Sequence, residues 1–382
     1  MKKKLLMLML SMALMTTVAC GKKEEEVKEP EVETPAVTEE AETGEEEVEE
    51  GDKLALELKA GFVTDEGGIH DASFNQSGWE GMQEARDLIE GLDVGYLESH
   101  TANDYAVNFE QMLDEGNQII LGAGFKLGAD TLAAAQANPE VNYVLVDESF
   151  EFLLDGAEMP KNLLGVLFND HESSFLVGYI AGKTTQTDKV GFVGGMEGRV
   201  ISAFEYGYKA GVDYAAKELG KEIEIFSQYV GDFSDAAKGK SIANSFYQDG
   251  ADIVFHASGG AGAGVIGAAI EQGEGYWAIG VDRDQIDEGP DNVLTSAMKR
   301  VDIAVKNVLV DLAKGEPFPG GTVRNYGLQD DGAVDIAPSS DKHVAPEILD
   351  EIPGLKDEII AGNIVVPNNA ETYEVYKAEL NK

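Results

Sequence analysis

The sequence predicts an α/β protein with two doubly wound parallel-sheet lobes joined by a hinge. From residue 53 onwards, short β-branched or apolar runs alternate with amphipathic segments of helix length. This alternation is typical of parallel sheets that carry helices on both faces. The ten strand candidates, spread over about 330 residues, also fit two consecutive lobes better than one sheet.

The strand candidates are apolar or β-branched runs bounded by turn residues. They are residues 58–64, 94–99, 118–123, 143–147, 163–168, 190–194, 223–229, 253–257, 277–282 and 293–297. The expected helices are residues 105–115, 126–137, 173–184, 201–219, 235–248 and 301–314. Because helices separate most of the strands, each lobe is expected to be built from β-α repeats.

The order of these elements suggests where the lobes divide. We expect lobe 1 over residues 54–167 and lobe 2 over residues 168–293. The chain would then return to lobe 1 over residues 294–321, and residues 322–382 would hold a further hinge crossing and the C-terminal segment. Several crossings between two lobes make a hinge that opens and closes over a cleft.

The N-terminus predicts export and a membrane anchor. Residues 1–20 contain three lysines, a short apolar run and Cys20, the sole cysteine of the chain, as in a secretory signal peptide. Residues 17–20 resemble the lipobox of bacterial lipoproteins, although Thr17 stands where Leu, Val or Ile is usual. A lone cysteine has no disulfide partner, so we expect lipidation of Cys20, with a cleaved and freely secreted protein as the alternative.

An acidic segment at residues 21–53 follows the signal peptide. Residues 22–52 contain fourteen glutamates and no aromatic residue, so they cannot bury enough apolar surface to fold. We expect a disordered spacer that holds the folded body away from a membrane. The net charge of the chain is −42, which makes nucleic acid an improbable partner because phosphate binding requires a basic patch.

The corner at residues 67–81 is the most informative candidate for a binding site. It follows the strand that starts at residue 58, and its helix begins near Ser73, with Asp71 or Ser73 as N-cap. Asp71, Phe74 and Asn75 would lie at the carboxyl end of that strand, where open α/β sheets bind ligands. The carboxylate and the amide can read the polar edge of a purine, although both side chains could instead be helix caps.

Phe233 offers a matching aromatic ring in the second lobe. It lies in a turn, residues 231–239, where polar residues are usual. A planar base stacks well between aromatic faces, and Phe74 opposite Phe233 would form such a clamp. Either ring taken alone could belong to the core.

Residues 262–267 read GAGVIG, and Asp282 lies twenty residues after Gly262. This spacing after a strand matches a dinucleotide-binding fingerprint, so an NAD-dependent oxidoreductase is a rival interpretation. The glycines could equally serve tight helix packing. The helix N-terminus still offers backbone donors towards the cleft, and we take Gly260 as the candidate contact there.

Asp282 also ends a strand, as does Asp147 in the first lobe. A carboxylate can accept two hydrogen bonds from the adjacent hydroxyls of a ribose, and such charge-assisted bonds are strong. A turn or helix cap is the simpler role for either aspartate. Lys299 follows a short strand, and solvent exposure would be its ordinary fate.

Several of these segments resemble the basic membrane protein (BMP) family of lipoproteins, the purine nucleoside receptors of ABC transporters. They are GG-x-x-D-x-SFNQ-x-x-W-x-G at residues 67–81, VD-E at 146–148, GG-M at 194–196, VD-x-DQ at 281–285 and LTS-x-x-K at 294–299. The resemblance covers nearly all of residues 58–367 and implies the type I periplasmic binding protein fold. It also implies a closing helix at residues 355–362 and a strand at 364–367.

The resemblance implies ligand contacts by Asp71, Phe74, Asn75, Asp147, Phe233, Asp282 and Lys299, and Gly260 completes the set of eight candidate contacts. The ligand would be a purine nucleoside such as inosine, guanosine or adenosine, delivered to an ABC transporter permease from the outer face of the cell membrane. A sensory receptor for a nucleoside or sugar remains an alternative. We expect no cofactor and no metal, since the five histidines form no zinc motif and no nucleophile elbow or P-loop occurs. The protein is therefore not expected to be an enzyme.

Overall fold

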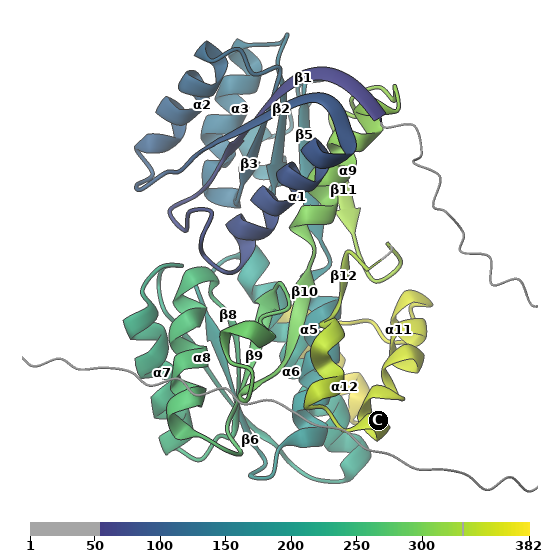
Figure 1. Ribbon diagram of the computed structural model, residues 1–382. Helices are drawn as coiled ribbons and strands as arrows, with labels where there is room; N and C mark the ends of the chain where they lie inside the picture. The colour runs from purple at the N-terminus through teal and green to yellow at the C-terminus, as the bar shows by residue number, and fades with distance from the viewer. Residues whose placement is uncertain (1–53, 331) are drawn as a thin grey trace, which may run out of the picture. The chain divides into compact units, whose positions relative to one another are not determined.

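The computed structural model describes residues 54–330 and 332–382. The expected signal peptide, Cys20 and the acidic spacer therefore lie outside the described residues. The rest of the chain contains two six-stranded sheets with helices on both faces (Figure 1).

The first sheet has the strand order β11-β5-β4-β3-β1-β2. All its neighbouring strands are parallel. The strands are β1 Leu54–Val63, β2 Ile89–Leu97, β3 Ile119–Ala123, β4 Asn142–Val146, β5 Leu163–Phe168 and β11 Thr322–Tyr326. The carboxyl ends of these parallel strands therefore meet at one edge, as the sequence predicted.

The second sheet has the order β12-β10-β9-β8-β6-β7. Its strands are β6 Lys189–Gly194, β7 Glu224–Tyr229, β8 Ile253–Ala257, β9 Trp277–Asp282, β10 Val293–Lys299 and β12 Val334–Ile336. All pairs are parallel except β10 with β12, which is antiparallel. The two sheets thus repeat one topology and differ at one edge strand.

Helices α1 Phe74–Leu88 and α9 Val301–Ala313 cover one face of the first sheet, and α2 Asp104–Asp114 and α3 Gly128–Ala137 cover the other (Figure 1). In the second lobe, α5 and α6 pack on one face and α7 and α8 on the other. These helices are α5 Asp170–Thr184, α6 Arg199–Leu219, α7 Ala236–Gln248 and α8 Gly262–Gln272. A short helix, α4 Glu151–Leu154, connects β4 to β5.

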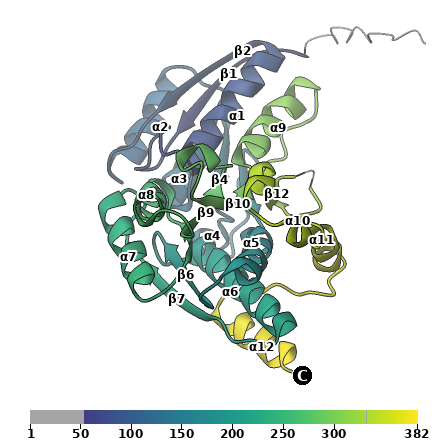
Figure 2. The same ribbon diagram turned by 60° about the horizontal axis from the view of Figure 1, so that its bottom comes forward.

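The C-terminal helices belong to the second lobe. They are α10 Pro346–Leu349, α11 Ile352–Ile360 and α12 Ala370–Leu380. Figure 2 shows α11 beside α5 and α12 beside α6, in agreement with their contacts. Their buried side chains, such as Leu355 and Tyr373, join the core of the second lobe. The C-terminal segment therefore enlarges the second lobe.

Alternation along the strands builds a core on each face of each sheet. In β4, Val144 and Val146 pack towards α1 and α9, whereas Tyr143 and Leu145 pack towards α2 and α3. This is the period of two that a strand imposes on its side chains. Strands buried on both faces read as continuous apolar runs, which made them visible in the sequence.

One crossing between the lobes lies later in the chain than the sequence suggested. The chain returns to the first lobe at Arg300, after β10, and not at residue 294, because β10 pairs with β9 in the second sheet.

The strand expected at residues 364–367 does not form, and that segment joins α11 to α12. The strands β11 and β12 were missed because they are short edge strands, and β11 has few apolar residues.

Candidate functional site

All eight predicted ligand-binding residues line one cavity between the two lobes. They are Asp71, Phe74, Asn75, Asp147, Phe233, Gly260, Asp282 and Lys299. The cavity contains about 530 Å³ of space that no protein atom fills, part of it open to solvent. The structure therefore brings together residues that lie up to 228 positions apart in the sequence, while their contact with a ligand stays a prediction.

Asp71 acts as the helix cap and also faces the cavity. Its carboxylate accepts hydrogen bonds from the backbone N–H groups of Ser73 (2.9 Å), Asn75 (2.9 Å) and Gln76 (3.0 Å). These bonds satisfy donors at the start of α1 that have no partner within the helix. The position of Asp71 in the cavity wall is therefore held firmly by the helix that it caps.

Asn75 joins Asp71 to Asp65, a cavity residue that the sequence analysis did not select. The Asn75 Nδ2 donates to Asp65 Oδ1 (2.8 Å) and to Asp71 Oδ2 (3.0 Å). Burial raises the pKa of Asp65 to about 6, although the Gly67 N–H and Asn75 oppose that effect. Asp65 follows the tip of β1, and its position at a strand end was the one signal that could have identified it.

Four phenylalanines contribute to the apolar part of the cavity wall, which also contains Val200, Ile201, Ala257 and Val281. Phe74 and Phe233 are half-buried and line the cavity from opposite lobes, so neither is a fully buried core residue. Phe125 and Phe204 also line the cavity and were not predicted. The Phe125 ring packs edge-on against Phe233, with centroids 6.3 Å apart and an interplanar angle of 75°.

Gly195 makes room for the Phe233 ring. A Cβ atom at this position would lie 2.2 Å from the ring Cε1 of Phe233, which is too close for real atoms. Because Gly195, in the GG-M segment at residues 194–196, has no side chain, the Phe233 ring can lie against this segment.

Lys299 is buried with three carboxylates around it. Its side chain is 1% exposed, and its Nζ lies 2.7 Å from Asp147 Oδ1 and 3.2 Å from Asp170 Oδ1. Burial by itself lowers the pKa of this lysine, but the attraction of Asp147, Asp170 and Asp282 outweighs burial and leaves the pKa above its usual value. Lys299 is therefore a fixed positive charge in the wall of the cavity.

The Lys299 ammonium also lies over aromatic rings. The distances from Nζ to the ring centroids are 5.2 Å for Phe74, 5.3 Å for Phe168 and 5.5 Å for Phe204. Cations are attracted to aromatic faces at such distances. The rings and the carboxylates together hold the ammonium in one place.

Asp282 ends β9 and contacts the first lobe. The Ser73 hydroxyl donates to its carboxylate. Burial raises the pKa of Asp282 to about 7, with Lys299 and Ser73 opposing the rise. Its backbone φ is +65°, a left-handed conformation in which aspartate is enriched among non-glycine residues, and this turn directs the chain away from the strand end.

Two glycines of the dinucleotide-like motif, Gly262 and Gly264, serve close packing. A Cβ atom at Gly262 would lie 2.0 Å from the His256 ring, and one at Gly264 would lie 1.8 Å from the carbonyl oxygen of Ala236. Gly264 thus allows α8 to approach the start of α7 closely. Gly260, by contrast, lines the cavity, and a Cβ atom there would meet the Asp71 Cβ at 3.8 Å.

Two features typical of other classes of protein are absent from the described residues. In residues 54–330 and 332–382, no group of three or more His, Cys, Asp or Glu side chains is arranged to hold a metal ion. Within the same part of the chain, no helix has both the length and the apolar character needed to cross a membrane.

The chain is similar in sequence to known proteins. A model of the family described as "Bmp: ABC transporter substrate-binding protein PnrA-like" matches residues 58–370. The ABC transporter nucleoside-binding protein BmpA of Lactococcus lactis is 39% identical over 334 residues, which cover 83% of this chain and 91% of that protein. Basic membrane protein A of Borreliella afzelii is 38% identical over 321 residues, covering 84% and 95% respectively.

Solved structures share the fold. An ABC transporter solute-binding protein from Aeropyrum pernix has a TM-score of 0.74 and 25% identity, covering 85% of this chain and 97% of that one. A second solute-binding protein, from Conexibacter woesei, has a TM-score of 0.64 and 21% identity, with coverage of 81% and 99%. The predicted two-lobed fold of the periplasmic binding proteins is thereby confirmed.

The family model is described as an ABC transporter substrate-binding protein, and the Lactococcus relative is named an ABC transporter nucleoside-binding protein. The expectation that this protein is not an enzyme is thereby confirmed. The family match spans both lobes and every residue that lines the cavity. The chain belongs to the Bmp family of PnrA-like ABC transporter substrate-binding proteins.

Proposed function

We propose that this protein captures a purine nucleoside between its two lobes and delivers it to the permease of an ABC transporter. The observation that carries the proposal is that Phe74 and Phe233 line one cavity from opposite lobes. Two aromatic walls suit a planar base, and stacking of a base on an aromatic side chain is worth about 1–3 kcal/mol. The name of the Lactococcus relative, a nucleoside-binding protein, agrees with this ligand class.

The polar groups beside the aromatic walls would read the edge of the base. Asp65 presents the carboxylate with more free acceptor capacity, because Asp71 already accepts four hydrogen bonds within the first lobe. The Asn75 amide donates to both carboxylates and fixes their spacing. A purine edge carries both N–H donors and ring-nitrogen acceptors. Asp65, with its pKa near 6, can accept a hydrogen bond when ionised and donate one when protonated.

The ribose would meet the charged side of the cavity. An ionised carboxylate has room for about four hydrogen bonds, and the Ser73 hydroxyl already donates one to Asp282. The remaining capacity suits the two adjacent hydroxyls of a ribose. Lys299 can donate to a sugar oxygen while Asp147 and Asp170 balance its charge.

Anchoring at the membrane is part of the same proposal. Lipidation of Cys20 would place the body on the outer face of the membrane, and a flexible spacer of the length of residues 21–53 would span about 30 Å. A sensory receptor that passes the closed lobes to a signalling partner is the second candidate function. A permease and an ATPase encoded beside this protein would favour transport.

Calorimetry with the chain that lacks residues 1–20 tests the ligand class. Inosine, guanosine and adenosine are titrated separately, with free ribose and a peptide as comparisons. Binding of at least one nucleoside, with none of ribose, is the expected result. If no nucleoside binds and the sugar or the peptide does, the base clamp is rejected. A thermal-shift assay with NAD tests the dinucleotide interpretation directly.

Detergent partition tests the anchor. The full chain expressed in a bacterium with lipoprotein processing should enter the detergent phase, whereas a Cys20→Ala variant should stay in the aqueous phase. Equal partition of the two proteins would contradict lipidation at Cys20.

A further inference from the structure

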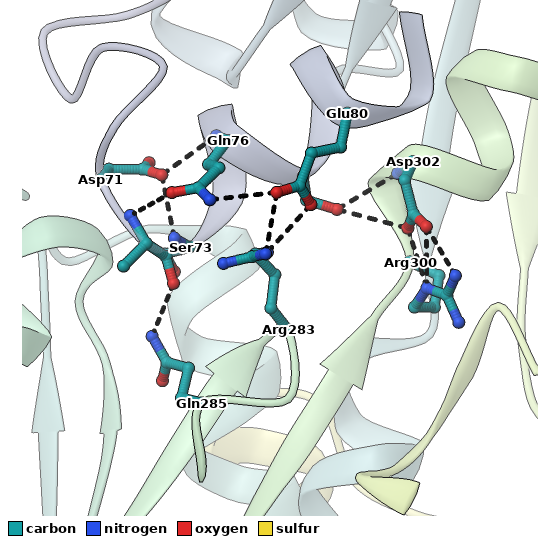
Figure 3. Close-up of polar contacts among 10 residues, drawn as sticks. Asp71, Ser73, Gln76, Glu80, Arg283, Gln285, Arg300 and Asp302 are labelled. Carbon is teal, nitrogen blue, oxygen red and sulfur yellow. Dashed lines mark hydrogen bonds and ion pairs between the residues drawn. The ribbon is translucent and has the colours of Figure 1, made fainter. Parts of the chain in front are cut away.

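A set of polar contacts joins the two lobes outside the ligand cavity (Figure 3). The main contact is a fork between Arg283, just after β9 in the second lobe, and Glu80 on α1 in the first. Arg283 Nη2 lies 2.8 Å from Glu80 Oε1, and its Nε lies 3.2 Å from Oε2. Neither residue lines the cavity, so this ion pair joins the lobes without facing the ligand.

The first lobe holds Glu80 ready for this contact. The Gln76 side chain donates to Glu80 Oε1 at 3.0 Å, and its own oxygen accepts from the Ala72 N–H at 3.2 Å. These bonds run along the start of α1 and fix the carboxylate in place (Figure 3). The side chains of Arg283 and Glu80 are 27% and 36% exposed, so the pair is accessible to solvent and to salt.

A second contact crosses the cleft at Gln285. Its amide oxygen accepts from the Val281 N–H (2.9 Å) and faces the His256 Nε2 (3.0 Å), so its NH₂ group is directed outwards. This group donates to the carbonyl oxygen of Ala72 in the first lobe at 2.9 Å. Because the second lobe alone orients the amide, the donor is in place before the lobes meet.

Ala72 is held in an unusual backbone conformation at this contact. Its φ is +53°, a left-handed value that costs a non-glycine residue of order 1 kcal/mol. In this conformation the Ala72 carbonyl group points towards the second lobe, where it accepts the hydrogen bond from the Gln285 amide. Strained backbone of this kind is concentrated at ligand clamps and switches.

We propose that the Arg283–Glu80 ion pair and the Gln285–Ala72 hydrogen bond form an interlobe latch that sets how fast the bound ligand is released. Both contacts join opposite lobes, so they are made when the cleft is closed and broken when it opens. Interactions present only in the closed state raise its population and slow the release of whatever it encloses. These residues would thus tune affinity without touching the ligand.

The same helix offers a matched control. Glu84, one turn after Glu80 on α1, pairs with Lys306 on α9 at 2.7 Å. Both α1 and α9 pack on the first sheet, so this ion pair stays intact when the lobes separate. Charge changes at Glu84 and Lys306 alter the same helix surface without altering the latch.

Charge reversal with inosine as the probe tests the latch, and this arm rests on the proposed function. Glu80→Arg and Arg283→Glu should each speed the dissociation of inosine by about three- to tenfold, because each places like charges across the cleft. The double variant should return the rate to within about twofold of the original. Higher salt should shrink the differences.

The control pair should behave differently in the same assay. Glu84→Arg and Lys306→Glu should leave the dissociation rate within about twofold of the original value. The latch is overturned if the Glu80 and Arg283 variants resemble the controls, or if the double reversal fails to restore slow release.

A Gln285→Glu variant probes the second contact. It keeps the shape of the side chain and the acceptor for Val281 N–H, but it removes the donor to Ala72. Dissociation of inosine should be faster, while a thermal unfolding scan confirms that the variant is folded. Release that is as slow as in the original protein would exclude Gln285 from the latch.

An interlobe distance measurement needs no ligand and separates this inference from the proposed function. Cys20 is the only native cysteine, so spin labels at Asp93→Cys in the first lobe and Glu274→Cys in the second can be introduced into a chain without it. Each single reversal should shift the distance distribution towards open lobes, and the double reversal should shift it back. Identical distributions in all four proteins would overturn the latch, whichever ligand the cavity binds.

Discussion

The two lobes share one strand order but contribute different chemistry to the cavity. Strands β1 to β5 of the first sheet occupy the same positions as β6 to β10 of the second. Asp147 and Asp282 follow the equivalent strands β4 and β9, and both adopt positive φ, +72° and +65°. Topology therefore places an aspartate at the same point of each lobe, whereas the neighbours of each aspartate give it a different role.

Those neighbours come from the opposite lobe in both cases. Asp147 of the first lobe pairs with Lys299 at the end of β10, and Asp282 of the second lobe accepts from Ser73 at the start of α1. Each lobe therefore provides the partner for an aspartate of the other lobe. Either lobe alone would leave a buried aspartate without its partner.

The largest effect is expected from removing the Lys299 ammonium group, which belongs to the second lobe and pairs with Asp147 of the first. Lys299→Met should lower the free energy of unfolding by about 3–5 kcal/mol, because it leaves Asp147 and Asp170 buried without a counter-charge. Urea unfolding measures this change. Lys299→Arg keeps the charge and should cost less. Equal stability of the methionine variant and the original protein would show that the two aspartates do not depend on Lys299.

A smaller effect should follow from filling the contact between α7 and α8. Gly264→Ala should destabilise the second lobe by about 1–3 kcal/mol, because the added methyl group would be overpacked against the Ala236 carbonyl. Gly267→Ala on the same helix meets no atom within 4 Å, and it should stabilise the helix by about 0.5–1 kcal/mol. Thermal unfolding of the two variants compares them, and changes of the same sign would reject the packing explanation.

The aromatic clamp, Phe74 and Phe233, allows the two lobes to be compared by their contributions to nucleoside binding. Phe74→Ala and Phe233→Ala should each weaken nucleoside binding by about 1–3 kcal/mol, since each lobe would lose one stacking surface. Isothermal calorimetry measures both. Phe152→Ala, at a side chain that is 85% exposed and outside the cavity, serves as the control and should change nothing. Loss at only one phenylalanine would mean that the base stacks on one lobe alone.

The last prediction concerns the dependence of stability on pH. Asp65 has its folded pKa raised to about 6 from 3.8 by burial, so the folded protein binds this proton more tightly than the unfolded chain. The stability that the proton contributes is present below about pH 4 and is lost as the pH rises towards 6, with a slope of at most about 1.4 kcal/mol per pH unit. Asp170 and Asp282, whose pKa values are also raised by burial, add loss in the same direction.

Urea unfolding between pH 4 and pH 7 checks this dependence. Asp65→Asn should flatten the decline, because the amide does not titrate. Asp104→Asn provides a contrast, since backbone N–H groups of Thr101 and His100 hold the pKa of Asp104 below its usual value, and its stabilisation is lost as the pH falls. An unchanged slope in Asp65→Asn would show that Asp65 is not the titrating group.

Local patterns were enough to predict much of the fold and the site. The strands β3, β5 and β8 are buried apolar runs, and such runs between turns are visible without any tertiary information. Asp71, Asp147 and Asp282 were selected because strand ends in α/β proteins meet at one edge, whereas Lys299 was selected through the resemblance to the BMP family. The edge strand β11, TVRNY, escaped prediction because its pairing with β5 and not its hydrophobicity defines it.

Residues that depend on distant partners were the ones missed. Phe204 lies on a helix face, and nothing in its neighbourhood of the chain distinguishes it from a core residue. The Arg283–Glu80 pair spans 203 positions, and each residue alone looks like an ordinary surface charge. Two chemically ordinary side chains become an interlobe contact only after both lobes are folded and face each other.

Hydrophobic period, a local property of the chain, was enough to indicate the two-lobed α/β architecture, whereas the eight candidate contacts came from strand-end positions together with the resemblance to the BMP family. Tertiary structure was needed to show that Lys299 is buried between aspartates, that Gly264 lets α8 approach α7 closely, and that Ala72 meets Gln285 across the cleft. Burial and pairing depend on what the rest of the chain brings alongside, and no local pattern records that.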